Sequence, residues 1–173
     1  MNYIPSFSLF WPSNPKKMSA IPLPSGEVIY LSDANSASDI ELLRENNIHF
    51  VVSIRTPWIY YSPVYSKIDS LPPNVDMITE TFWDHPTIDI SAPLERIINW
   101  ILSRDLNGKN LLIHCTEGKS RSVAVLIGYL MTIHMMEFEE AYKLIQHHRP
   151  IAQINDGFFQ QLQNLHQELN KIK

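Results

Sequence analysis

The chain has 173 residues, of which 45% are hydrophobic and 18% are charged, and its formal net charge at pH 7 is -4. This length suits one domain with its own core, and the negative charge argues against nucleic acid as the main partner. With a single cysteine, no intrachain disulfide can form, so we expect an intracellular protein, cytoplasmic with the nucleus as a second compartment. No stretch approaches the roughly 18 apolar residues of a membrane span, so no membrane insertion is expected.

The first half of the chain begins with an irregular segment and then alternates between strand and helix patterns. Residues 1–25 are rich in proline and serine and show no period, which favours an extended N-terminal arm before a domain over residues 26–173. Residues 28–32 and 49–55 predict buried strands, and SDIELLRENN between them predicts a short amphipathic helix.

A second strand and helix follow a less regular insertion. Residues 56–73 are rich in aromatic residues and proline without a clear period, and residues 75–82 predict a strand. Asp89 and Ser91 can cap a helix that ends near Asn107-Gly108.

The C-terminal third predicts one more strand and three helices. Residues 110–114 form the strand, residues 122–135 are apolar all round as in a buried helix, and EFEEAYKLIQHHR and residues 156–173 are amphipathic. This alternation predicts a single α/β domain with a mainly parallel central sheet flanked by helices. Ligands bind such sheets beyond the carboxyl ends of central strands.

The only cysteine, Cys115, lies at such a strand end and opens the loop CTEGKSR. A loop between a strand and a helix can aim several backbone N–H groups at one anion, and the helix N-terminus adds partial positive charge. Gly118 permits the tight turn, and the Arg121 guanidinium can bind two oxygens of a phosphate. These surroundings favour a thiolate, so the loop predicts a phosphate cradle with a nucleophile at its base.

A leaving oxygen also needs a proton donor from a neighbouring loop. Asp84 follows the strand over residues 75–82 and should reach the same edge of the sheet as Cys115. Asp89 is the competing candidate, but its place before ISAPLERII suits a helix cap better. We therefore prefer Asp84.

HCTEGKSRS resembles the signature loop of cysteine-dependent protein phosphatases, and its GKSRS portion is most similar to the dual-specificity branch. VIYLSDANSAS, FWDHPTIDI and RPIAQINDGFFQQL resemble further segments of that branch and occur in the right order. The resemblance implies that residues 26–173 are a dual-specificity phosphatase catalytic domain. Residues 1–25 match no kinase-docking arm, which indicates an atypical member.

The resemblance implies a role for each matching residue. Cys115 would be the nucleophile, Arg121 the phosphate clamp, and Asp84 the general acid and then the base for water. Ser122 would donate a hydrogen bond to the Cys115 sulfur and help it to leave. The implied phosphate-binding loop is Cys115, Thr116, Glu117, Gly118, Lys119, Ser120 and Arg121. Asn155 would support it, and His114 would order the loop and help to keep the cysteine as a thiolate. No metal or other cofactor is required.

The expected activity is hydrolysis of phosphotyrosine and phosphoserine or phosphothreonine in protein substrates. One alternative is the same chemistry on phosphoinositides or RNA 5′-phosphates, and another is a binding module that captures phosphoproteins without turnover. Glu117 is expected to be a solvated rim residue, and His114 a structural one. Packing, rather than a substrate groove, is the expected role of most aromatic residues in the insertion: Trp58, Tyr60, Tyr61 and Tyr65.

Overall fold

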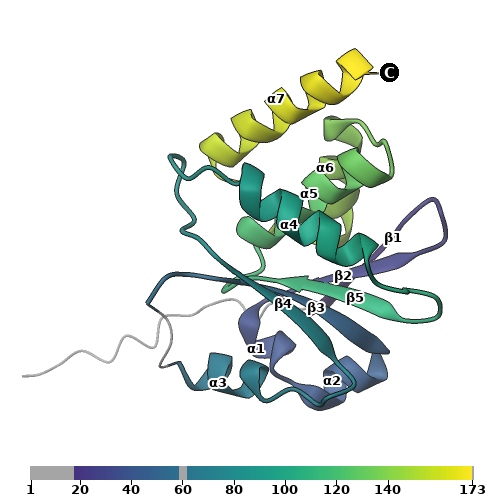
Figure 1. Cartoon of the computed structure of the whole chain (residues 1–173), viewed down its shortest axis with the longest axis vertical. Coiled ribbons are helices and arrows are strands. Elements are labelled where there is room, and N and C mark those ends of the chain that lie inside the picture. Colours follow the sequence, from purple (N-terminus) through teal and green to yellow (C-terminus); the bar gives the residue numbers. More distant parts are fainter. Residues whose placement is uncertain (1–17, 59–61, 173) are drawn as a thin grey trace, which may run out of the picture.

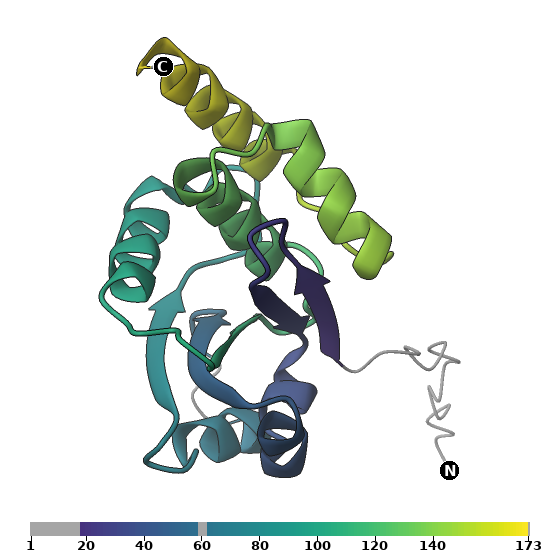
Figure 2. The same ribbon diagram turned by 90° about the vertical axis from the view of Figure 1, so that its right-hand side faces the viewer.

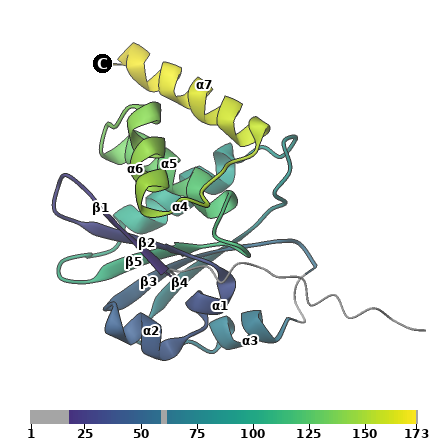
Figure 3. The same cartoon turned by 180° about the vertical axis from the view of Figure 1, so that it is seen from behind.

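The computed structural model describes residues 18–58 and 62–172, in which helices cover both faces of one β-sheet (Figures 1 and 3). Three short helices lie on one face: α1 (Ala34–Ala37), α2 (Ile40–Glu45) and α3 (Pro63–Asp69). Four longer helices lie on the other: α4 (Ser91–Leu102), α5 (Arg121–Ile133), α6 (Phe138–His148) and α7 (Asp156–Ile172).

The sheet has five strands in the order β1-β2-β5-β3-β4. All neighbouring pairs are parallel except β1 and β2, which are antiparallel. The single α/β domain with a mainly parallel sheet is therefore confirmed. The five strands are β1 (Met18–Pro22), β2 (Val28–Ser32), β3 (Ile48–Arg55), β4 (Asp76–Thr81) and β5 (Asn110–His114).

The helix α5 occupies the centre of the larger core. Every residue from Arg121 to Met131 is buried, which agrees with the apolar-all-round pattern of the sequence. The helix packs on β5 and contacts α4, α6 and α7. Because each buried Val or Leu contributes about 1.5–3 kcal/mol, this packing fixes the helix N-terminus firmly beside the end of β5.

Two short elements differ from the expectation from sequence. Residues 18–22 were placed in the N-terminal arm, but they form β1 at the edge of the sheet (Figure 2). Burial alternates along β1, and five residues are too few for that period to stand out beside prolines. In the insertion 56–73, α3 begins at Pro63 and buries only Tyr65 and Ile68, so it leaves no helical period either.

Other boundaries differ modestly from the expected ones. The strands β2 and β5 have the expected bounds, whereas α4 ends at Leu102 and a turn with Gly108 at φ 67° precedes β5. The remaining arm, residues 1–17, lies outside the described residues, as do Tyr60 and Tyr61. Across the described parts of the chain, no helix combines the length and apolar character needed to cross a membrane.

Candidate active site

The loop between β5 and α5 lies at the carboxyl edge of the sheet, between the parallel neighbours β2 and β3. Cys115 directly follows β5, and Arg121 is the first residue of α5. The strands β3 and β4 end at the same edge because both run parallel to β5, so the loops that follow them begin there. The fold therefore brings Thr56, Asp84 and the Cys115 loop together.

Cys115 lies at the base of this loop, and the residue is only 2% exposed. The backbone N–H of Gly118 donates a hydrogen bond to Sγ at 3.2 Å, and the Ser122 hydroxyl lies 3.3 Å from Sγ. Both contacts stabilise negative charge on sulfur when the hydroxyl donates. The loop amide at the sulfur is the kind of contact that the loop pattern predicted, and the Ser122 contact is the one that the family resemblance implied.

The Arg121 guanidinium is buried at the same edge. Its Nη1 donates to Thr56 Oγ1 at 2.7 Å, and its Nη2 donates to Thr116 Oγ1 at 3.0 Å. Among the described residues, its buried Nε has no hydrogen-bond partner. A phosphate oxygen in the cradle would supply the missing acceptor, because a buried unpaired donor is unfavourable.

Asp84 extends from the loop after β4 to the rim of the Cys115 loop. Its Oδ1 accepts hydrogen bonds from Ser120 Oγ at 2.7 Å and from Asn155 Nδ2 at 2.8 Å. Asp89 instead accepts from the N–H and hydroxyl of Ser91, the first residue of α4. These bonds hold the pKa of Asp89 below its usual value. The geometry thus places Asp84 beside the loop and Asp89 at a helix start.

The family model for the dual specificity phosphatase catalytic domain matches residues 29–168. The chain belongs to the dual-specificity phosphatase family. Rat dual specificity protein phosphatase 15 is 35% identical over 136 residues, covering 78% of this chain and 53% of the relative. Zebrafish dual specificity protein phosphatase 22-B is 32% identical over 135 residues, covering 78% and 68%.

Solved structures of this phosphatase family have the same fold. Human DUSP28 is 26% identical with a TM-score of 0.74, covering 90% of this chain and 97% of that one. DUSP15 is 29% identical with a TM-score of 0.69, covering 89% and 95%. The chain spans about half the length of the rat phosphatase 15 that it matches.

His114, which begins the phosphatase signature, is completely buried. Burial lowers its pKa to about 4, so the ring is uncharged at neutral pH. Its Nδ1 lies 3.4 Å from the carbonyl oxygen of Cys115, and its ring stacks against Tyr65 at a centroid distance of 6.5 Å. His114 is therefore placed to order the backbone at Cys115. Contrary to the implied role in favouring the thiolate, its buried ring adds no positive charge for that purpose.

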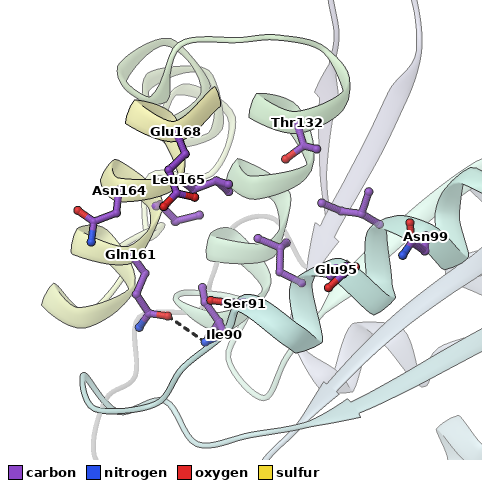
Figure 4. Close-up of a pocket in the computed structure, with 12 residues that line it drawn as sticks. Ile90, Ser91, Glu95, Asn99, Thr132, Gln161, Asn164, Leu165 and Glu168 are labelled. Atoms are coloured by element: carbon purple, nitrogen blue, oxygen red, sulfur yellow. Dashed lines mark hydrogen bonds between the residues drawn. The ribbon is translucent and has the colours of Figure 1, made fainter. Parts of the chain in front are cut away.

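The loop that carries Asp84, residues 82–90, is held by residues of α7 to which the sequence pattern assigned no role. The Gln161 amide nitrogen donates to Ile88 O at 2.8 Å. Its oxygen accepts from Ile90 N at 2.9 Å, the bond drawn in Figure 4. A Cβ at Gly157 would lie within 1.9 Å of Pro86 O, so only glycine permits this close approach. The groove between α4 and α7 in Figure 4 is lined by residues outside the Cys115 loop.

The insertion contributes one residue to the support of the site. Tyr65 is 2% exposed, and its hydroxyl lies 3.2 Å from Thr116 Oγ1, which also accepts from Arg121. The packing role expected for Tyr65 agrees with this burial. Trp58, by contrast, is 82% exposed. Glu117 and Lys119 are exposed on the rim of the loop.

Proposed function

We propose that this chain hydrolyses phosphotyrosine, phosphoserine and phosphothreonine in proteins through a phosphocysteine intermediate. The observation that carries the proposal is the pair of hydrogen bonds to the Cys115 sulfur, from Gly118 N–H and Ser122, beneath a loop closed by Arg121. Hydrogen bonds donated to the sulfur stabilise the thiolate, which is the nucleophilic form of cysteine. Family membership and the names of the relatives support the same activity.

In the first step, the Cys115 thiolate attacks phosphorus and an S–P bond forms as the P–O ester bond breaks. The loop amides and Arg121 stabilise the charge on the three equatorial phosphate oxygens. Asp84 gives its proton to the departing alcohol or phenol oxygen. Both hydrogen bonds from Ser120 and Asn155 end on Oδ1 of Asp84, which leaves Oδ2 to carry that proton.

In the second step, water attacks the phosphocysteine and the S–P bond breaks. Asp84, now a carboxylate, accepts a proton from the water as the new P–O bond forms. The leaving group is the Cys115 thiolate, and the Ser122 hydroxyl at 3.3 Å can donate to it. Inorganic phosphate leaves and the resting thiolate is restored.

Protein substrates are favoured over polyanionic lipids by the charge around the loop. Lys119 on the rim is offset by Glu117, so the loop offers little cationic surface beyond Arg121. Two exposed tryptophans, Trp58 and Trp83, are available instead for the apolar residues that flank a phosphorylated side chain.

The test is a substrate panel with phosphotyrosine and phosphothreonine peptides, phosphoinositides and an RNA 5′-triphosphate. We expect the highest kcat/KM on the peptides, and Cys115→Ser should abolish turnover while phosphopeptide binding is kept. A preference of about tenfold or more for a phosphoinositide or the RNA would overturn the substrate class. Binding of phosphopeptides by the wild-type chain without any turnover would instead establish a binding module.

A further inference from the structure

Arg149 is buried beneath the Cys115 loop, although no carboxylate bonds to its guanidinium among the described residues. It caps the C-terminus of α6 and is 1% exposed. Its Nε donates to Gly118 O at 2.5 Å, its Nη2 to Glu117 O at 3.4 Å, and its Nη1 to Ser19 Oγ on β1 at 3.2 Å. Burying a cation among neutral oxygens lowers the free energy of unfolding, so a functional role for Arg149 would account for its position.

The two carbonyls that Arg149 binds determine where two loop amides point. In a trans peptide the C=O and the following N–H point in opposite directions, and none of the described peptides is cis. Holding Glu117 O toward Arg149 aims Gly118 N–H the other way, where it donates to Cys115 Sγ at 3.2 Å. Holding Gly118 O in the same manner aims Lys119 N–H into the cradle.

The carbonyls on either side are bound by other elements. Thr116 O accepts from Ala34 N of α1 at 3.2 Å, and Lys119 O accepts from Gln153 N at 2.9 Å. Four consecutive carbonyls, from Thr116 to Lys119, are therefore held away from the phosphate position. Arg149 supplies the two central contacts from a single side chain.

Shape and charge also connect Arg149 with the loop. Gly118 has φ 64°, and a Cβ there would lie 2.5 Å from Arg149 Nη2, so the guanidinium fits only against glycine. Burial lowers the pKa of Arg149, whereas the negative charges of Asp33 and Cys115 act to raise it. The guanidinium also lies against the carbonyls of Glu117 and Gly118 in the loop that begins at Cys115, and a cation beside a cysteine loop favours the nucleophilic thiolate form.

We propose that Arg149 is a positioning residue for the phosphatase reaction: it aims the amides of residues 118 and 119 at the thiolate and the phosphate, and its charge stabilises the thiolate. Through Ser19, it also couples the edge strand β1 to the active-site loop. The inference rests on the proposed function for its catalytic consequence, but not for its effect on the thiol.

The test measures the pH midpoint for alkylation of Cys115 by iodoacetate, together with kcat/KM and Tm. Arg149→Met should raise the midpoint by about one pH unit and lower kcat/KM by about 100-fold, as for the loss of an oxyanion donor. Arg149→Lys keeps the charge but cannot hold both carbonyls, and should be intermediate. Ser19→Ala should change both values in the same direction by a smaller amount.

Ile101→Ala, a buried change at the far end of α4, is the control and should lower Tm without moving the midpoint. The proposal is overturned if Arg149→Met folds with a midpoint within about 0.3 pH unit of wild type and a kcat/KM within about twofold of wild type. If that variant does not fold, unchanged midpoints in both Arg149→Lys and Ser19→Ala overturn it. A wild type without phosphatase activity whose thiol midpoint still moves in Arg149→Lys would defeat the proposed function and support this one.

Discussion

Burial of His114 should make the stability of this chain depend on pH in a defined window. Its folded-state pKa is about 4, against a usual value of 6.5, and the ring is fully buried. Between these values the unfolded state binds the proton and the folded state does not, so the free energy of unfolding falls as pH drops. The gap of about 2.5 pH units corresponds to about 3.4 kcal/mol in total, of which about 1.8 kcal/mol is lost between pH 7 and pH 5.

The assay is urea denaturation of the wild type and His114→Gln at pH 7 and pH 5. Carboxylates and other histidines also titrate. The informative quantity is therefore the difference between wild type and variant in the free energy of unfolding that each loses from pH 7 to pH 5. We expect that difference to be about 1.8 kcal/mol, whatever the variant costs at pH 7. His147→Gln, on an exposed position of α6, is the matched control and should keep the wild-type pH dependence. An equal loss in wild type and His114→Gln would refute the reasoning.

Three further outcomes test the site. Asp84→Asn should flatten the falling high-pH limb of the rate profile and slow the hydrolysis of substrates with poor leaving groups by about 100- to 10,000-fold. Asp89→Asn should keep the limb. The reverse result would show that Asp89 is the general acid. Gly118→Ala should lower both Tm and kcat/KM, because its Cβ would lie 2.4 Å from Ser32 O. The positive φ at this position alone costs a non-glycine residue about 1–3 kcal/mol. A Tm and an activity near those of the wild type would contradict the loop geometry. Peroxide should inactivate the enzyme at Cys115, with recovery only from a sulfenamide or mixed disulfide because the chain has no second cysteine; inactivated protein unmodified at Cys115 in mass spectra would rule this out.

The sequence predicted the parts of the site that depend on local pattern. The apolar run before Cys115, the polar loop and the apolar helix after Arg121 together define a strand, a loop and a buried helix, and parallel strands must end at one edge. The choice of Asp84 over Asp89 also followed from local context, since Asp89 directly precedes a helix. Its role in catalysis remains a prediction.

What the sequence could not give are contacts between distant segments. Arg149 binds the Gly118 carbonyl across 31 residues. It opens the family-like segment RPIAQINDGFFQQL, but nothing in that segment shows that its side chain is buried against the Cys115 loop. Likewise, β1 becomes a strand only because β2 pairs with it, and Ser19 is buried only because α6 packs against β1. Gln161 is one of several glutamines on α7, and only the packed structure shows that it holds the loop that carries Asp84.

The central claim, a covalent phosphocysteine at Cys115, is tested most directly by acid-quench trapping with a ³²P-labelled phosphopeptide. We predict label on Cys115, with more of it in Ser122→Ala, because that variant removes the hydroxyl 3.3 Å from the leaving sulfur and slows the second step more than the first. Ser103→Ala, a change at the end of α4, should label like the wild type. Turnover of the peptide with no label at Cys115 in either the wild type or Ser122→Ala would contradict the account.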